Sequence, residues 1–432
     1  MGVGDRGYPN IDYYGREIMN TIKLQQLAWY DPKELVLPLP DGWQVEIYNM
    51  AGHNRPALKP DEIKAAISKT IGTAPIRELA KGKKEVVIIF DDMTRVTRVA
   101  EIVPFVLEEL TEAGIPDSSI RFVMALGCHG AKDRRDFVKK LGEDVLARFP
   151  VYNHNAFGNC TYVGTTATFG TKVYVNEEVM KCDLKIAIGS VVPHPTTGFG
   201  GGGKIILPGV TSFETIEHNH GTIYRIVREE GRPVAGMGIF DNNPVRIDIE
   251  EAATLAGLDM IIDCIVNTRG ETVSIHAGAL KPAYAAAVQE AKTHYLTPKV
   301  EGKDIAIANT LAKANEGWIG LPIAHQAIKP EGGDVVLIAN MPEGQVTHYL
   351  LGPFGKTSFG PKRFGPRLPR RVNHLIVYTE YPDLTSRAWF GEDPDRVRFL
   401  HNWDDVLEFL QKAHEGDAKV AVYPNAEIQY CT

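Results

Sequence analysis

A histidine, a glycine-rich turn and a lysine lie within eleven residues, from His194 to Lys204. The glycines of this turn are Gly198, Gly200, Gly201, Gly202 and Gly203. Because they lack side chains, they could turn backbone N–H groups toward a phosphate or another anion. Two isoleucines follow the lysine, and a partly desolvated amine can act as a neutral nucleophile. The segment predicts an active-site loop; the alternative is a glycine turn that serves only flexibility or tight packing.

Residues 198–204 also fit G-x-x-x-x-G-K, the pattern of a nucleotide-binding P-loop. A P-loop needs Ser or Thr directly after the lysine, because that hydroxyl holds magnesium. Ile205 stands there instead and supplies no oxygen. The turn therefore does not predict a magnesium-nucleotide site.

Polar residues follow three segments that have the composition of buried strands. Residues 86–90 precede Asp92, Thr94 and Arg95; residues 120–125 precede His129; residues 184–192 precede His194. Loops at the carboxyl ends of parallel strands carry chemistry more often than strand interiors do. Cys128 precedes His129, but neighbours on an extended chain point apart, which argues against a Cys/His nucleophile pair. The three loops predict one shared site.

Taken together, these segments resemble the nickel-dependent lactate racemase family over most of the chain. The matching pieces, in order, are D-D-x-T-R at residues 91–95, His129, His194 with Lys204 ten residues on, the run G-F-x-G-G-x-K-x-I-L-P-G, His220, and Q-x-x-K at residues 326–329. Each piece alone is weak, whereas the ordered set with its spacing is specific. The resemblance implies an isomerase, a racemase or epimerase that acts on a 2-hydroxy acid.

The family carries a nickel-pincer nucleotide, in which pyridinium-3-thioamide-5-thiocarboxylic acid mononucleotide binds nickel. The resemblance implies that Lys204 holds this cofactor covalently through the thioamide, beside the glycine turn. His220 would complete the coordination of nickel, whose other donors are two sulfurs and a ring carbon. His218 is the alternative ligand; only one of two residues so spaced is expected to reach the metal, and the family spacing selects His220. Separate biosynthetic proteins would supply the cofactor.

The same resemblance assigns the reacting groups. His129 and His194 would be paired acid–base groups on opposite faces of the substrate. Removing the hydroxyl proton together with the C2 hydride gives a flat 2-keto acid, which can take the hydride back on its other face. A pyridinium ring accepts hydride, and histidine exchanges protons near neutral pH.

The other matched residues would hold the substrate and position the cofactor. Arg95, Gln326 and Lys329 would bind the substrate carboxylate, while Asp92 and Thr94 would help to position the cofactor or a catalytic base. Two structural alternatives stay open. Asp92 and Arg95 could form only a local ion pair, and Lys329 could be a cation at a helix end, because proline and glycine follow it.

Three positions depart from the family pattern. Pro195 replaces an aromatic residue after the loop histidine, Gly203 replaces an arginine before the lysine, and His325 replaces a tyrosine before Gln326. These changes remove bulk or add polarity, which suits a larger acid or a second substrate hydroxyl. An aldonate, an aromatic or a longer 2-hydroxy acid is therefore at least as consistent with the site as lactate. Trp389 is the candidate for a tryptophan that the family has in its second domain.

Composition indicates a soluble enzyme. The 432 residues carry 47 Lys and Arg against 54 Asp and Glu, a net charge of −7, so no general basic surface exists for nucleic acid. No apolar run approaches the ~18 residues that cross a bilayer, and no apolar signal segment is visible at the N-terminus. Five widely spaced cysteines without C-x-x-C predict reduced thiols and a cytoplasmic location. The oligomeric state stays open.

Alternating strand-like and helical segments predict two α/β domains with the active-site cleft between them. Residues 1–280 would form an N-terminal cofactor-binding and catalytic domain with a Rossmann-like portion, residues 281–300 a connecting helix, and residues 301–432 a C-terminal α/β domain. The strands expected in the first domain are 86–90, 120–125, 184–192, and an antiparallel pair at 260–266 and 271–276. Those expected in the second are 304–308, 334–340, 375–379 and 419–423, with helices at 322–328 and 403–413.

A basic, proline-broken segment covers residues 362–371. It is either a solvated loop or a contact for an anionic substrate or phosphate.

Two other function classes stay open. A phosphate-site nucleotide hydrolase would explain the glycine turn and the paired aspartates, but it leaves the three matched histidines without roles. A non-catalytic carrier of the nickel cofactor would explain Lys204 and His220, but not the two bases. A covalent adduct on Lys204 would exclude the hydrolase, and stereochemical turnover would exclude the carrier.

Overall fold

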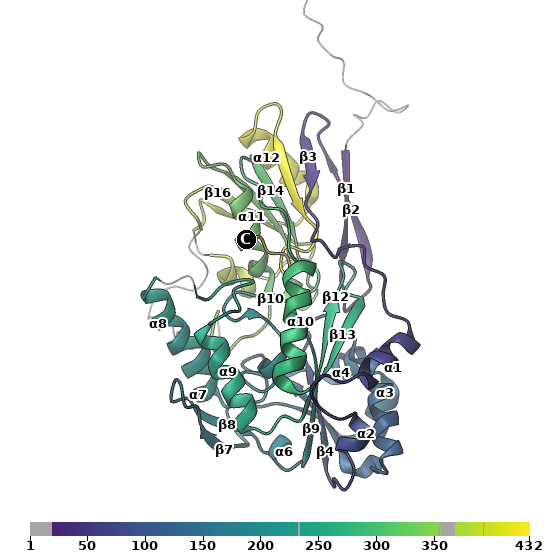
Figure 1. Ribbon diagram of the computed structural model, residues 1–432. Helices are drawn as coiled ribbons and strands as arrows, with labels where there is room; N and C mark the ends of the chain where they lie inside the picture. Colours follow the sequence, from purple (N-terminus) through teal and green to yellow (C-terminus); the bar gives the residue numbers. More distant parts are fainter. Residues whose placement is uncertain (1–19, 232–233, 353–354, 356–367, 392) are drawn as a thin grey trace, which may run out of the picture.

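Two six-stranded sheets form the framework of the chain (Figure 1). The computed structural model describes residues 20–231, 234–352, 355, 368–391 and 393–432. In Figure 1 the first sheet occupies the lower part and the second the upper part, with helix α10 (Leu280–His294) beside the region between them. The predicted α/β class with two sheets is confirmed.

The first sheet has the strand order β13-β12-β9-β4-β5-β6. Its strands are β4 (Val86–Asp91), β5 (Ile120–Ala125), β6 (Val151–Asn153), β9 (Leu184–Ser190), β12 (Met260–Val266) and β13 (Thr272–Gly278). All pairs are parallel except β12 and β13, which are antiparallel as predicted. Read from its other edge, this is the 3-2-1-4-5-6 order of doubly wound sheets, which bind ligands where the order reverses. The reversal falls between β4 and β9.

The second sheet has the order β17-β16-β15-β14-β18-β3, and all of its pairs are parallel. Its strands are β3 (Gln44–Ile47), β14 (Ile305–Asn309), β15 (Gly333–Ile338), β16 (Val372–Tyr378), β17 (Val397–Leu400) and β18 (Lys419–Tyr423). Residues 44–47 lie in the range predicted for the N-terminal domain, but β3 pairs with β18 of the second sheet. Along the chain, β3 of the second sheet therefore comes first, the strands of the first sheet follow, and the remaining strands of the second sheet come last. The other domain boundaries stay predictions.

Helices cover the sheets, and short strands lie outside them. The helices are α1 (Pro60–Ser68), α2 (Ile76–Leu79), α3 (Val99–Glu112), α4 (Arg134–Leu141), α5 (Glu143–Arg148), α6 (Glu177–Met180), α7 (Phe213–Ile216), α8 (Tyr224–Glu229), α9 (Pro244–Leu255), α11 (Leu321–Ala327) and α12 (Trp403–Ala413). The outlying strands are β1 (Asn20–Gln26), β2 (Lys33–Leu39), β7 (Cys160–Thr165), β8 (Lys172–Asn176), β10 (Pro193–His194) and β11 (Gly198–Phe199).

Strand β4 shows why the first sheet is buried on both faces. Val87 and Ile89 enter one hydrophobic cluster, whereas Val86, Ile88 and Phe90 enter the cluster on the opposite face. This alternation follows from the two-residue period of a strand. An apolar run without polar positions is typical of a parallel strand that helices cover on both sides. The polar residues that follow β4 are therefore delivered to the edge of a rigid, buried strand.

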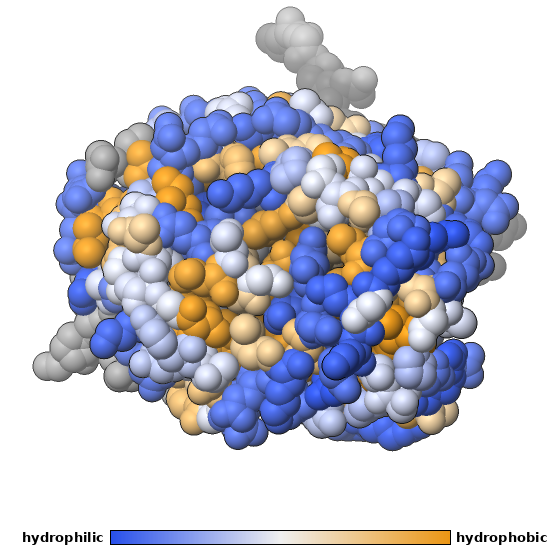
Figure 2. Space-filling view, turned by 60° about the horizontal axis from the view of Figure 1, so that its bottom comes forward, coloured by the Kyte–Doolittle hydropathy of each residue, from blue (hydrophilic) through white to orange (hydrophobic). Residues whose placement is uncertain are grey.

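The surface contrasts with this core. Figure 2 shows a face covered mostly by hydrophilic residues, with hydrophobic residues grouped near its centre. Within the described residues, no helix combines the length and the apolar character that crossing a membrane requires.

A buried ion pair fixes the end of β4. Lys140 of α4 is fully buried, and its Nζ donates to Asp91 Oδ1 at 2.8 Å, to the Arg95 carbonyl at 2.9 Å and to the Thr97 carbonyl at 3.2 Å. Asp91 also accepts a hydrogen bond from the Thr97 hydroxyl. Burial raises the pKa of Asp91 and lowers that of Lys140, while each partner's charge opposes the shift of the other. One lysine thus holds both ends of the turn that carries Asp92 and Arg95.

We expect Lys140→Met to lower the free energy of unfolding by about 3–5 kcal/mol, because it leaves the Asp91 carboxylate buried without its cation. Urea denaturation measures the change. Lys139→Met on the same helix is the control; its ammonium is partly exposed and lies 3.8 Å from Asp136, so its loss should cost less than about 1 kcal/mol. The double variant Asp91→Asn, Lys140→Met should recover part of the loss. Wild-type stability of Lys140→Met would contradict this account of the turn.

Candidate active site

A cavity of about 260 Å³ lies at the reversal point of the first sheet. Residues after β4, β5 and β9 line it, together with residues that follow strands of the second sheet. The polar lining includes Asp92, Thr94, Arg95, His129, His194, Lys204 and His220 from the first group, and Glu316 and His348 from the second. The prediction that three strand ends contribute to one site is therefore confirmed.

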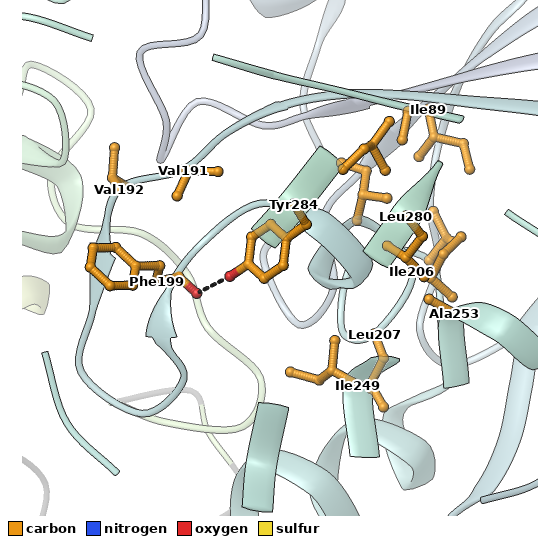
Figure 3. Packing of buried hydrophobic residues seen from close by; sticks show 14 of the residues in the cluster. Ile89, Val191, Val192, Phe199, Ile206, Leu207, Ile249, Ala253, Leu280 and Tyr284 are labelled. Carbon is orange, nitrogen blue, oxygen red and sulfur yellow. Dashed lines mark hydrogen bonds between the residues drawn. The ribbon is translucent and has the colours of Figure 1, made fainter. Parts of the chain in front are cut away.

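The glycine turn is shaped by packing. Gly198 and Gly202 have φ angles of +76° and +57°, where residues with a Cβ are strained. A Cβ on Gly202 would lie 2.7 Å from the ring of Tyr284, and one on Gly198 would lie 2.3 Å from the Ile239 carbonyl oxygen. In Figure 3 Tyr284 lies beside Phe199 of the turn, with its hydroxyl hydrogen-bonded to the Phe199 carbonyl. The tight-packing interpretation explains these glycines.

Two N–H groups of the turn already have partners within the chain. Gly200 donates to the Val192 carbonyl at 2.7 Å, and Gly202 donates to Asp263 Oδ2 at 2.8 Å. The expected cradle of free N–H groups is therefore wrong at these positions. Among the five glycines, Gly201 and Gly202 line the cavity, whereas Gly198, Gly200 and Gly203 are outside its lining.

Lys204 lies at the centre of a cluster with two histidines. Its Nζ is 3.0 Å from His220 Nε2 and 3.4 Å from His194 Nε2. Only 9 % of Lys204 is exposed. Burial lowers its pKa well below the usual value, and the charges of Arg95 and Arg246 lower it further. Burial therefore favours the neutral, nucleophilic form of the amine.

His220 is the member of the 218/220 pair that faces this cluster. The two histidines lie in a π-helical turn, Glu217–Ile223, a feature often found at functional sites. His218 Nδ1 instead lies 2.7 Å from the Thr171 hydroxyl, and its ring lines a different hollow. His220 Nδ1 is buried without a hydrogen-bond partner. Burial and then Lys204 lower the pKa of His220 well below normal.

His129 is paired with a carboxylate. Its Nδ1 donates to Asp92 Oδ2 at 2.5 Å, and Thr94 donates to Asp92 Oδ1 through its N–H at 2.9 Å and its hydroxyl at 2.6 Å. Burial opposes the ionisation of Asp92, but His129, Thr94 and Arg95 together hold the pKa of this carboxyl well below its usual value. An ionised carboxylate on Nδ1 orients the ring and leaves Nε2 for proton exchange.

His194 approaches from the neighbouring strand. It lies on β10, and its Nδ1 accepts hydrogen bonds from the N–H of Thr196 at 3.3 Å and from the Thr196 hydroxyl at 3.1 Å. Burial, and then the charge of Lys204, lower the pKa of His194 well below its usual value. His129 follows β5 and His194 follows β9, and these strands flank β4. The two histidines thus reach the cavity from opposite sides of the central strand.

Arg95 is held by groups from both sheets. Its Nη1 donates to the Thr94 carbonyl and hydroxyl, both at 2.8 Å, and lies 3.4 Å from Glu316 Oε2. Lys313 Nζ is 3.3 Å from the same carboxylate oxygen. Burial and then Arg95 lower the pKa of Lys313 to about 8, while Lys313 and Arg95 outweigh the effect of burial on Glu316 and lower its pKa to about 2. The proposed purely local Asp92–Arg95 pair does not describe this arrangement.

Lys313, Glu316 and His348 were not singled out from the sequence. Lys313 and Glu316 follow the strand β14, so the strand-end argument used for the first sheet would have found them if it had been applied to the second. His348 carries no such local signal. Residues 128–130 and 347–349 pair across the sheets: Gly130 donates to the Thr347 carbonyl at 2.9 Å, and Tyr349 donates to the Cys128 carbonyl at 2.7 Å.

Gln326 and Lys329, which were predicted to bind the substrate carboxylate, do not line the cavity. Lys329 Nζ donates to Asp304 Oδ1 at 2.5 Å, and Gln326 donates to the Pro322 carbonyl at 3.1 Å. Gln326 and His325 line a separate hollow with Arg370 and Arg371. Gln326 lies on α11 and Lys329 follows the end of that helix, and neither residue lines the cavity. Lys329 thus belongs to a surface ion pair.

Other sequence candidates fall beside the site. Trp389 packs edge-on against the ring of His348 at 6.1 Å and stacks on Trp318 at 6.4 Å, but it is outside the cavity lining. Pro195 lines the cavity.

Burial strongly raises the pKa of Cys128, which disfavours the thiolate that a nucleophile needs. Of the basic segment, residues 362–367 lie outside the described residues.

The fold and site define a two-sheet α/β protein with a buried lysine and three histidines at a doubly wound switch point. The pattern of the lactate racemase N-terminal domain matches residues 30–230. Lactate racemase of Thermoanaerobacterium thermosaccharolyticum is 28 % identical over 324 residues, 73 % of this chain and 74 % of that protein. Lactate racemase of Lactiplantibacillus plantarum is 28 % identical over 402 residues, 86 % of this chain and 91 % of that protein. Residues 30–230 thus match the lactate racemase N-terminal domain, and most of the chain is similar to these two lactate racemases.

Two solved structures share the fold. The lactate racemase apoprotein of T. thermosaccharolyticum superposes with a TM-score of 0.72 at 22 % identity, covering 96 % of this chain and all of that one. A structural-genomics protein of Thermotoga maritima gives a TM-score of 0.64 at 19 % identity, covering 87 % of this chain and 99 % of that one. The two-sheet arrangement is thus shared beyond this sequence.

Proposed function

We propose that this protein is a racemase or epimerase that inverts C2 of a 2-hydroxy acid by proton-coupled hydride transfer, using a nickel-pincer nucleotide attached to Lys204. The observation that carries the proposal is the buried Lys204 amine, which lies 3.0 Å from His220 Nε2 and whose pKa burial lowers. The site lies between residues of both sheets, as expected for the predicted interdomain cleft, which would exclude water during hydride transfer.

The residues present fit such a cofactor. Lys204 offers the neutral amine that forming a thioamide bond needs, and His220 Nδ1 is buried without a partner. Among the described residues, no group of three or more His, Cys, Asp or Glu side chains is arranged to hold a metal ion. A metal at His220 would therefore need most of its donors from an organic group, and a pincer ligand provides two sulfurs and a carbon. When bound, its pyridinium ring would supply the hydride acceptor.

The chain's own residues would handle the proton and the carboxylate. One histidine takes the hydroxyl proton as the C2 hydride leaves, and the substrate becomes a planar 2-keto acid; the hydride then returns to the other face, where the second histidine gives a proton to the oxygen. His129 is oriented for this role by Asp92, and His194 is neutral and so able to accept a proton. We assign carboxylate binding to Arg95, which lines the cavity, in place of Gln326 and Lys329.

The rival classes have less support. A nucleotide hydrolase would need free N–H groups in the glycine turn, yet Gly200 and Gly202 already donate within the chain. A cofactor carrier would need no Asp92–His129 pair. Cofactor-biosynthesis proteins would be the partners that load Lys204.

A screen of 2-hydroxy acids with cofactor-loaded protein in deuterium oxide tests the function. We expect one or more acids to epimerise at C2 with little solvent deuterium entering that carbon, because the hydride returns within a closed site. Chiral chromatography and mass spectrometry follow configuration and label. Wash-in of deuterium at the rate of turnover would replace hydride transfer by direct deprotonation.

Replacing either His129 or His194 by Asn should lower racemisation by about 10²–10⁴-fold, the usual contribution of a general acid–base group. Because each histidine serves one face, each variant should still oxidise one enantiomer in a single turnover, and the two variants should prefer opposite enantiomers. His218→Asn is the matched control, since its ring is outside the cavity. Equal reaction of both enantiomers in both variants would refute the two-base assignment.

Intact-mass spectrometry and metal analysis should separate the tether from the metal ligand. We expect Lys204→Ala to lose the covalent adduct, and His220→Ala to keep some adduct while losing nickel, because one metal donor is removed and the tether is untouched. His218→Ala should keep both. Stoichiometric nickel in His220→Ala would show that another residue completes the coordination.

A further inference from the structure

His348 stands on the wall of the cavity that the second sheet provides. It belongs to the segment that pairs with residues 128–130, and its ring centroid lies 5.0 Å from that of His129. Trp389 packs against the ring from behind at 6.1 Å. The position of the ring is therefore fixed from both sides.

Backbone hydrogen bonds determine the tautomer of His348. The N–H groups of Leu350 and Leu351 both donate to His348 Nδ1, each at 3.1 Å. A ring nitrogen that accepts hydrogen bonds carries no proton, so the proton of the neutral ring is on Nε2. Burial and then the charge of His129 lower the pKa of His348 to about 3. The ring therefore stays neutral in the physiological range and presents Nε2–H as a donor only.

This donor has no hydrogen-bond partner within the described part of the chain. Glu316, which also follows a strand of the second sheet, lines the same cavity and is close enough to influence His348 electrostatically. The wall that the second sheet provides thus offers one fixed donor and one carboxylate acceptor beside His129. A hydroxyl group both accepts and donates, so it can satisfy the two together.

We propose that His348 Nε2–H binds a hydroxyl oxygen at C3 of the substrate, with Glu316 accepting the hydroxyl proton, and that the enzyme therefore acts on 2,3-dihydroxy monocarboxylic acids. The proposal rests on the proposed racemase function and specifies its substrate class. Lactate has a methyl group at C3 and would leave both groups unpaired. Sites built to bind a hydroxyl reject analogues that lack it, because buried polar groups lose their partners.

Glycerate and lactate test this directly, because they differ only by the C3 hydroxyl. With cofactor-loaded wild type we expect kcat/KM for glycerate to exceed that for lactate by about 10²-fold or more. His348→Asn keeps an acceptor where Nδ1 stands but removes the Nε2–H donor, so the glycerate-to-lactate ratio should fall toward one. His348→Gln places an N–H near the original donor and should restore part of the ratio. His325→Asn, in the separate hollow, should leave the ratio unchanged.

The tautomer gives a second readout that needs neither cofactor nor turnover. In ¹⁵N-histidine-labelled protein, His348 should show a protonated Nε2 and an unprotonated Nδ1 from pH 5.5 to 8; the reverse pattern would overturn the proposal. Equal kcat/KM for glycerate and lactate in the wild type, or an unchanged ratio in His348→Asn, would also overturn it while leaving the racemase function intact. Absence of turnover with every 2-hydroxy acid would instead overturn the proposed function, and the substrate assignment with it.

Discussion

The character of the cavity depends on one lysine that is buried beside histidines and other cations. Burial, and then the charges of Arg95 and Arg246, lower the pKa of Lys204 and so disfavour its ammonium form. The glycine turn is what allows this burial. Gly202 sits against the Tyr284 ring of α10, and a Cβ on Gly203 would lie 3.1 Å from atoms of Ile249 on α9. The glycines thus let the backbone of the turn pack closely against α9 and α10, and this packing buries Lys204.

The two sheets supply different groups to the site. The groups assigned to the reaction follow strands of the first sheet, while the groups that would select the substrate, Glu316 and His348, follow strands of the second. The pairing of residues 128–130 with 347–349 joins the two parts beside His129. Substrate selection could therefore change through the second sheet while the reacting groups stay in place.

The sequence predicted those features that depend on local pattern. Buried apolar runs located the strands, and strand ends located Asp92, His129 and His194, because a doubly wound sheet brings such ends together. Features that depend on long-range packing were missed. Lys140 lies in the charged helix segment RRDFVKKL, where a lysine is expected to face water, and β3 joins a sheet whose other strands lie more than 250 residues away along the chain. The Q-x-x-K match does not bring Gln326 and Lys329 to the cavity, because their side chains bond to Pro322 and Asp304 instead.

The charges around Arg95 limit the kind of acid that can bind. Arg95 and Lys313, whose pKa is about 8, are both cationic at neutral pH, and Glu316 balances only one of them. A single substrate carboxylate would pair with Arg95, which lines the cavity. A second carboxylate near C3 would be repelled by Glu316, whereas a hydroxyl there would not. Charge repulsion by Glu316 and the hydrogen-bonding wall thus favour the same substrates, monocarboxylic acids with polar but uncharged groups beyond C2.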